Sequence, residues 1–300
     1  MLSYRHAFHA GNFADVLKHS TLALILDYFT LKQKGFSYID SHSGAGMYRL
    51  SDEYAQKTGE FKQGIAKLIN NDDLPEALVD YVNIIKQLNG ANTAESYNDK
   101  ESSGTNNINI NAENFDIYPG SPGIAKQFMR RQDAAHLFEL HPADNQLLNE
   151  FCQRWNKARV SQSDGYKGTL GQLPPPTRRG IVLIDPPYEL KEDYHKAVKT
   201  IIDGYKKFAT GCYILWYPVV KREHVKQMAE QFKASDLRNV LQVEYCQQAD
   251  TEEYGMTGTG LFIVNPPWQL AKQLEEILAY MKRHLGNANT TTSLEELIAE

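Results

Sequence analysis

The segment that most constrains the fold is a short, almost wholly apolar run near the middle of the chain. Gly180-Ile181-Val182-Leu183-Ile184 contains no charged residue and leads directly into Asp185. A strand this apolar is buried on both faces, as the central strands of parallel sheets are. The run therefore predicts a parallel sheet with helices packed on both of its sides.

Strand-like and helix-like segments alternate on either side of this run. Apolar residues at helical spacing predict helices over residues 14–31 and 268–285, among others. Alternating strands and helices are typical of a doubly wound sheet, so we expect a Rossmann-like α/β fold. Further strands are expected at residues 36–40, 135–140, 159–161, 212–217, 240–245 and 260–264, the last two as an antiparallel pair at one edge.

The interval between the first two predicted strands departs from this alternation. It is helical from about residue 51, with no strand between the preceding loop and the helices. Residues 91–114 are rich in Asn, Ser, Thr and Gly, which is typical of a flexible insertion. We therefore divide the chain into residues 1–50 (N-terminal motif, first helix, first strand and glycine loop), 51–117 (a small inserted helical subdomain), 118–286 (the rest of the α/β domain) and 287–300 (a polar and acidic tail).

Charge and composition exclude some classes of protein. The net charge is −5 and the pI is about 6.0, whereas proteins that coat nucleic acids are usually basic. Basic residues gather between residues 154 and 179, with Lys126, Arg130 and Arg131 nearby, and predict either a phosphate-binding face or an ordinary solvated one. There is no membrane-length apolar run or leader-like start, and the three cysteines are far apart. We expect a cytoplasmic protein that uses neither a membrane nor a metal.

The segment Asp185-Pro186-Pro187-Tyr188 stands at the carboxyl end of a central strand, where ligands bind in open α/β sheets. The prolines remove N–H donors, which leaves the Pro186 carbonyl to accept a hydrogen bond beside the Asp185 carboxylate. An adenine exocyclic amine is a poor nucleophile, because its lone pair is delocalised into the ring. Two acceptors that receive its two N–H bonds would favour a pyramidal nitrogen whose lone pair points at the methyl group of a sulfonium. Tyr188 would stack on the base. The competing interpretation is a proline-rich turn without chemistry.

A second segment of the same form, Asn265-Pro266-Pro267-Trp268, also follows an apolar strand. It comes after the last predicted strand, where we expect the edge of the sheet, whereas Asp185 follows the fourth strand. Position therefore favours Asp185 as the catalytic residue.

Small and acidic residues follow the first three predicted strands and form a candidate cofactor site. The loop Ser41-His42-Ser43-Gly44-Ala45-Gly46 lets the backbone approach a ligand closely. Glu139 ends the second strand, where an acid can hold the two ribose hydroxyls of an adenosyl group. Asp164-Gly165 ends the third and is placed to accept from an adenine amine. In this order along one sheet, these residues predict an S-adenosylmethionine-dependent methyltransferase.

Six segments together resemble the RlmJ family, bacterial methyltransferases that make N6-methyladenosine in 23S ribosomal RNA. They are residues 4–19, the Ser-His-Ser-Gly-Ala-Gly loop, Pro119-Gly120-Ser121-Pro122, Phe138-Glu139-Leu140-His141-Pro142, Asp164-Gly165 and Asp185-Pro186-Pro187-Tyr188. The resemblance covers nearly the whole chain. Residues 91–114 and the acidic tail depart from it, and neither carries a motif.

The resemblance implies roles that sequence patterns alone do not show. The contacts to S-adenosylmethionine would come from Lys18 (at its carboxylate), His19, His42, Ser121, Glu139 (at the ribose), Asp164 and Gly165 (at the adenine) and Asp185. Asp185 would also accept from the target amine, and Tyr4 would contact the substrate adenosine. Such an enzyme releases S-adenosylhomocysteine, acts alone as a monomer, and prefers 23S ribosomal RNA that is not yet buried in a finished ribosome.

Three other functions stay open on the sequence. A DNA adenine methyltransferase uses the same kind of turn, although no sequence-reading DNA domain is evident. A glutamine-amide methyltransferase also uses such a turn, in different surroundings. A non-catalytic nucleic-acid-binding protein, for example one tied to DNA uptake, would have no need of Asp185.

Overall fold

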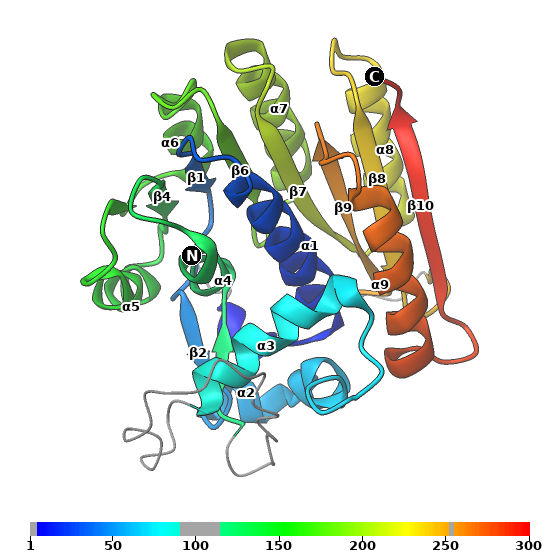
Figure 1. The fold of residues 1–300 in the computed structure, drawn as a ribbon. Helices are drawn as coiled ribbons and strands as arrows, with labels where there is room; N and C mark the ends of the chain where they lie inside the picture. Colours follow the sequence, from blue (N-terminus) through cyan, green and yellow to red (C-terminus); the bar gives the residue numbers. More distant parts are fainter. Residues whose placement is uncertain (1–4, 91–114, 252–254) are drawn as a thin grey trace.

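The computed structural model describes residues 5–90, 115–251 and 255–300, and the fold is built on one large central sheet (Figure 1). Its strand order is β10-β8-β9-β7-β6-β1-β4-β5. The strands are β1 (Ser37–Asp40), β4 (Ala134–Phe138), β5 (Ala158–Ser161), β6 (Gly180–Ile184), β7 (Cys212–Val219), β8 (Val240–Cys246), β9 (Gly258–Val264) and β10 (Thr291–Ile298).

The strands are parallel in one half of the sheet and antiparallel in the other half. Strands β5, β4, β1, β6 and β7 run parallel, with β6 paired between β1 and β7. Every residue of β6 is buried, as its apolar composition requires. Strand β9 is antiparallel to both β7 and β8. The predicted Rossmann-like α/β fold is confirmed, and so is the antiparallel pairing of the strands near residues 240 and 260.

The chain end differs from expectation. Residues 287–300 were expected to be a polar and acidic tail, but residues 291–298 form β10, which pairs antiparallel with β8 and so takes the sheet edge. Strand β9 lies between β7 and β8, so it is an interior strand, and the expectation that it lies at the edge is wrong. Only one of the eight residues of β10 is buried, so the strand forms without an apolar pattern.

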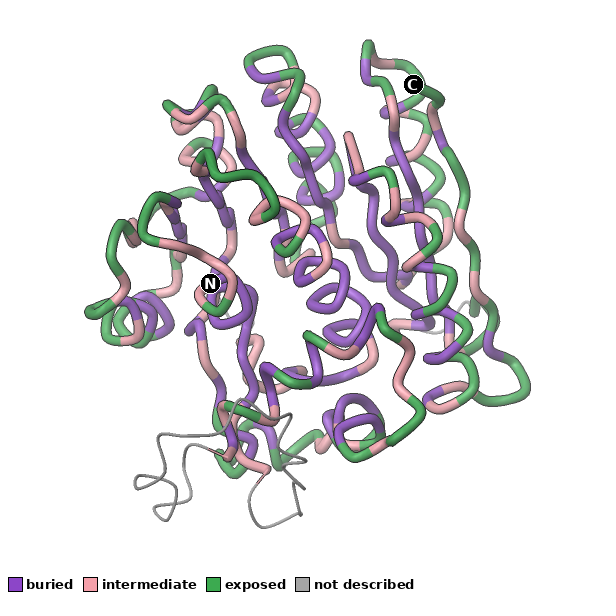
Figure 2. Tube along the Cα trace, viewed as in Figure 1, coloured by how far each residue is buried: buried purple, intermediate pink, exposed green. Residues whose placement is uncertain are grey.

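Helices cover both faces of the sheet (Figure 1). One face carries α1 (Phe13–Thr30), α3 (Glu76–Gly90), α4 (Ser121–Phe128), α5 (Pro142–Cys152) and α9 (Leu270–Leu285), and the other carries α6 (Gly165–Gly171), α7 (Glu192–Lys207) and α8 (Arg222–Lys233). In α7 the buried residues Tyr194, Ala197, Val198 and Ile201 recur at the spacing of one helical face. Figure 2 shows the burial concentrated on the sheet and on the helix faces turned towards it.

A helical insertion separates β1 from β4. It begins and ends with the short strands β2 (Met47–Arg49) and β3 (Ile117–Pro119), which pair antiparallel and bring its two ends together. Between them lie α2 (Glu53–Thr58), the 3-10 helices η2 (Glu60–Gln63) and η3 (Ile65–Lys67), and α3. The expectation that no strand precedes these helices is wrong, because β2 does. The flexible insertion predicted at residues 91–114 falls outside the described residues.

The insertion shares the main hydrophobic core. Tyr81, Val82 and Ile85 of α3 belong to the same buried cluster as Leu22 of α1 and Ile277 of α9. Because burial of this apolar surface favours folding, the insertion and the sheet stabilise each other.

Two arginines near the basic stretch cap a helix. Arg130 Nη1 donates to the Thr30 and Lys32 carbonyls at 2.8 and 2.9 Å, and Arg179 Nη2 donates to the Phe29 carbonyl at 2.9 Å. Carbonyls at the end of α1 lack partners within the helix and favour cations. These two residues are therefore engaged with the protein itself. No helix within the described residues is long and apolar enough to cross a membrane.

Candidate active site

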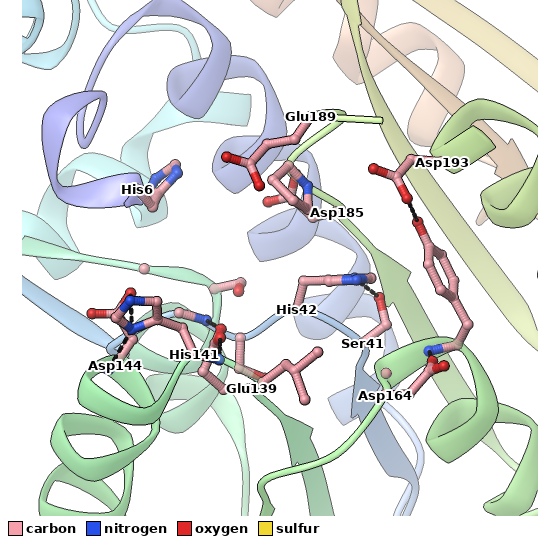
Figure 3. Close-up of a pocket in the computed structure, with 18 of the residues that line it drawn as sticks. His6, Ser41, His42, Glu139, His141, Asp144, Asp164, Asp185, Glu189 and Asp193 are labelled. Atoms are coloured by element: carbon pink, nitrogen blue, oxygen red, sulfur yellow. Dashed lines mark hydrogen bonds and ion pairs between the residues drawn. The ribbon is translucent and has the colours of Figure 1, made fainter. Parts of the chain in front are cut away.

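A cavity of about 260 Å³ opens at the carboxyl ends of β1, β4, β5 and β6 (Figure 3). The chain turns towards opposite sides of the sheet after β1 and β6, which is the position where ligands bind in doubly wound folds. Each strand is followed by lining residues. The loop from Ser41, Glu139 and Asp185 come directly after β1, β4 and β6, and Asp164 comes three residues after the end of β5.

Asp185 lies on the wall of this cavity beside a lysine from α1. Lys18 Nζ donates to Asp185 Oδ2 at 2.6 Å, and the Lys18 side chain is only 3% exposed. The same ammonium lies 2.9 Å from Oδ1 of Asp15. One buried cation is therefore shared by two carboxylates that are 170 residues apart along the chain.

Asp15 is fully enclosed behind the wall. It accepts from the Gly11 backbone N–H at 2.9 Å, and His6 Nε2 lies 2.9 Å from its Oδ2. Burial acts to raise the pKa of Asp15, but the charges of His6 and Lys18 outweigh it and hold that pKa well below its usual range. Asp15 is therefore ionised throughout the physiological range.

Glu139 is fixed at the start of the loop after β4. Its Oε2 accepts from the Gly44 N–H at 2.8 Å and its Oε1 from the His141 N–H at 2.7 Å. Burial raises the pKa of Glu139, and the two backbone N–H groups oppose that rise. Each oxygen retains acceptor capacity, because a carboxylate offers about four lone-pair sites in all.

A second buried carboxyl lies beneath the glycine loop. Asp40 Oδ2 accepts from Tyr38 Oη and from Ser121 Oγ, each at 2.7 Å. Burial raises the pKa of Asp40 to about 6, although the hydroxyl groups of Ser121 and Tyr38 act to lower it. Ser121 lines the cavity, so Asp40 orients a hydroxyl group of the wall.

Two histidines of the wall are neutral at pH 7. Burial lowers the pKa of His42 to about 4 and that of His19 to about 3. Nδ1 of His42 lies 2.7 Å from Ser41 Oγ, and Nδ1 of His19 lies 2.8 Å from Tyr118 Oη. Both side chains therefore offer hydrogen-bonding groups rather than positive charges to a ligand.

Asp164 and Gly165 form the start of α6. The Asp164 carboxylate accepts from the backbone N–H groups of Tyr166 and Lys167 at 2.9 and 3.2 Å, as N-cap residues do. A Cβ atom on Gly165 would lie 1.7 Å from the Ser41 carbonyl oxygen. Only glycine allows the loops after β1 and β5 to approach this closely.

Two residues of the predicted catalytic turn do not line the cavity, whereas Pro187 does. Pro186 and Tyr188 are not among the residues that line the cavity. Tyr188 has a φ of +52°, and its hydroxyl donates to the Trp216 carbonyl at 2.6 Å while its ring packs against Tyr194. Tyr4, the predicted substrate contact, lies outside the described residues.

The competing turn lies at the opposite end of the strands from the cavity. Because β9 is antiparallel to β7, its carboxyl end lies beside the beginning of β7. Asn265 Nδ2 there donates to the carbonyls of Ala209 and Gly211, both at 2.8 Å. Asn265 thus supports a turn, and Trp268 is 81% exposed.

Comparisons with known proteins agree on one family. Residues 33–102 and 104–298 match the family model described as ribosomal RNA large subunit methyltransferase D, RlmJ. The chain belongs to the RlmJ family. It is 43% identical to ribosomal RNA large subunit methyltransferase J of Escherichia coli K12, over 97% of this chain and 96% of that one. It is 46% identical to the Haemophilus influenzae protein of the same name, over 95% of this chain and 94% of the relative.

A crystal structure of a Legionella pneumophila protein shares the RlmJ-type fold seen here. The two superpose with a TM-score of 0.82 at 33% identity, covering 96% of this chain and 98% of that one. Together with the family match, this similarity makes the chain an RlmJ-type methyltransferase with a Rossmann-like sheet. The resemblance to RlmJ noted from sequence motifs is confirmed.

The RlmJ cavity contains residues that the sequence did not single out. His6, Asp144 and Tyr166 line it, and Asp15 supports it from behind. Asp15 had a usable signal, because it precedes Lys18 by three residues and so shares its helix face. Asp144 is joined to the N-terminal segment by Arg5 at 3.0 Å, a contact across the fold that no local pattern indicates. Among residues 5–90, 115–251 and 255–300, no group of His, Cys, Asp and Glu is arranged to hold a metal ion.

Proposed function

We propose that this chain transfers a methyl group from S-adenosylmethionine to the N6 amine of an adenosine in 23S ribosomal RNA. The observation that carries the proposal is Asp185, which lies on the cavity wall at the carboxyl end of the central strand β6 and is followed by two prolines. Membership of the RlmJ family supports the same reaction class.

The charge of the cavity supports a cationic cofactor. The carboxylates on its wall are Glu139, Asp144, Asp164, Asp185, Glu189 and Asp193, against the ammonium groups of Lys18 and Lys196. His19 and His42 add no positive charge at pH 7, because burial lowers the pKa of each. S-adenosylmethionine supplies an activated methyl group on a sulfonium, and an acidic cavity attracts such a cation.

The residues present fit the remaining parts of this cofactor. Glu139 is held by two backbone N–H groups, so its remaining lone pairs can accept from the two ribose hydroxyls. Asp164 and Gly165 would contact the adenine, and the loop at His42 together with Ser121 would contact the methionine part. Lys18 and His19 line the same wall and would complete these contacts.

The target amine would be activated by hydrogen-bond acceptors. The Asp185 carboxylate and the Pro186 carbonyl would each receive one N–H of the amine, so that its lone pair points towards the methyl group. Most of the rate enhancement would then come from positioning and from stronger hydrogen bonds in the transition state. Tyr188 would stack on the base only after the hydrogen bond from its hydroxyl to the Trp216 carbonyl is broken and its ring turns towards the cavity. Tyr4 remains our candidate for a further contact to the adenosine.

The relatives support an RNA substrate. Two proteins more than 40% identical over nearly the full length are named ribosomal RNA large subunit methyltransferase J. An enzyme that methylates a base must take it out of any helix, and an unpaired base costs least to extract. We therefore propose free 23S ribosomal RNA, before subunit assembly is complete, as the substrate of a monomeric enzyme.

The test is direct. The purified chain is incubated with isotope-labelled S-adenosylmethionine and either protein-free 23S ribosomal RNA, assembled large subunits, 16S ribosomal RNA or duplex DNA. The nucleosides are then released by nuclease digestion and identified by mass spectrometry. We expect labelled N6-methyladenosine from free 23S ribosomal RNA alone. Label in DNA, or on any other atom of the RNA, would contradict the proposal.

A further inference from the structure

Asp15 joins two residues of the cavity wall from behind. Its carboxylate is 1% exposed and lies between Lys18, whose Nζ is 2.9 Å from Oδ1, and His6, whose Nε2 is 2.9 Å from Oδ2. Lys18 in turn lies 2.6 Å from Asp185. The four side chains form a continuous series, Asp185, Lys18, Asp15 and His6. Its two ends, His6 and Asp185, lie on the cavity wall (Figure 3).

A buried carboxylate in such a position requires compensation. An ionised carboxyl without partners in the protein interior is strongly disfavoured. Here His6 and Lys18, which carry or can carry positive charge, contact Asp15, and Nε2 of His19 lies 3.9 Å from its Oδ1. The Gly11 backbone N–H donates to it as well. The contacts with these residues therefore offset the free-energy cost of burying the Asp15 carboxylate.

The shared lysine affects how Asp185 can act. Two carboxylates compete for the ammonium of Lys18, so Asp185 receives only part of its hydrogen bonding and charge. Lys18 contacts Oδ2 of Asp185, which makes Oδ1 the oxygen for a target amine. Without the charge of Asp15, Lys18 would interact more strongly with Asp185 and weaken it as an acceptor.

We propose that Asp15 is a positioning residue for methyl transfer, which holds His6 on the cavity wall and keeps Lys18 divided between two carboxylates. This inference rests on the proposed function. It assigns to a residue outside the cavity an effect on the rate of the reaction that is larger than its effect on cofactor binding through Lys18.

The test compares two variants of the same chemical type. Asp15→Asn keeps an oxygen that can accept from Gly11 but removes the charge. The matched control is Glu60→Gln, because Glu60 also contacts a histidine and an amide of the N-terminal segment, His9 and Asn12, both at 2.9 Å. Glu60 does not line the cavity.

For the full chain, kcat and KM are measured with 23S ribosomal RNA, and the Kd of S-adenosylmethionine is measured by calorimetry. We expect Asp15→Asn to lower kcat at least about tenfold, as loss of a charged hydrogen-bond partner does, with Kd changed by less than about threefold. Glu60→Gln should keep kcat within about twofold of wild type, since its contacts are away from the reacting groups. Asp15→Glu, which restores the charge, should recover part of the loss.

Each other outcome has a definite meaning. If Asp15→Asn keeps the wild-type kcat, or loses cofactor affinity as steeply as rate, Asp15 is not a positioning residue. If Asp15→Asn does not fold, Asp15→Ser takes its place, because serine also removes the charge and is a smaller side chain for this buried position. Failure of both to fold would assign Asp15 to stability and overturn the inference. A wild-type chain that methylates no RNA rejects the proposed function instead.

Discussion

Asp185 and Asn265 each follow a buried strand and precede two prolines, yet they lie at opposite ends of the strands of the same sheet. Strand β6 runs parallel to β1, whereas β9 runs antiparallel to β7. The end of β6 therefore meets the cavity and the end of β9 meets the loop before β7. Strand direction separates two sequence motifs that look alike.

Replacing Asn265 should affect stability and spare activity. Its φ of +52° suits glycine, so Asn265→Gly removes the two side-chain hydrogen bonds without straining the backbone. We expect the free energy of unfolding to fall by about 1–3 kcal/mol. The methylation rate should remain near that of wild type. A folded Asn265→Gly variant without activity would mean that the wrong turn was chosen.

Asp185→Ala should stop methyl transfer. The change removes the carboxylate that would accept from the target amine, and loss of one positioned hydrogen-bonding group of this kind commonly costs about 100- to 1000-fold in kcat. Cofactor binding should be largely kept, because Glu139 and the loop after β1 are untouched. Rate measurements paired with calorimetry check both points, and a rate within a few-fold of wild type would rule out this role for Asp185.

Glu139→Ala should weaken the binding of S-adenosylmethionine. A carboxylate that accepts from two hydroxyls contributes charged hydrogen bonds of about 1.5–3 kcal/mol each, so we expect Kd to rise about tenfold or more. Calorimetry gives the Kd directly. Glu150→Ala, a change on the exposed side of α5, serves as the control. An unchanged Kd in Glu139→Ala would refute the ribose contact.

Asp40 should make the folded chain less stable as pH rises. Its pKa is raised from 3.8 to about 6, so between these values the folded state keeps a proton that the unfolded state has lost. The stabilisation is complete below pH 3.8 and is lost as pH rises through 6. With about 1.4 kcal/mol per pKa unit, the stability of Asp40→Asn relative to wild type should increase by roughly 2–3 kcal/mol between pH 4 and 7.5.

Urea unfolding of both proteins at several pH values measures this difference. Other titrating groups, such as Asp15 with its lowered pKa, are common to the two proteins and cancel in the comparison. A difference that does not change with pH, or that changes in the opposite direction, would show that Asp40 is not protonated preferentially in the fold.

The central part of the fold was predictable because burial leaves a strong mark on sequence. Strand β6 is apolar throughout, and α7 has its apolar residues on one face. Strands β2 and β3 have three residues each, too few to show a period. Strand β10 is largely exposed, and only its pairing with β8 defines it. Short or outer strands depend on partners that lie far away in the sequence.

The residues of the candidate site also fall into a part that the sequence predicts and a part that it does not. Glu139 and Asp185 were predictable, because each stands directly after a strand that the apolar pattern reveals, whereas Asp164 comes three residues after the short strand β5. The contact of Lys18 with Asp185 joins residues 167 positions apart and depends on the packing of α1 against the sheet. The direction of the Tyr188 ring depends on a left-handed backbone conformation that the sequence does not indicate. Local rules place residues at the site, and tertiary packing decides their partners.

Strand β10 also matters for anyone who prepares this protein. Residues 291–298 cover the backbone N–H and C=O groups along one side of β8. A recombinant chain that stops near residue 290 would leave seven apolar-rich residues of β8 with an open edge, which readily pairs with another chain. Such a product is expected to be recovered mainly in the insoluble fraction. Its activity would be low because little soluble enzyme remains, although the truncation removes no residue of the cavity wall.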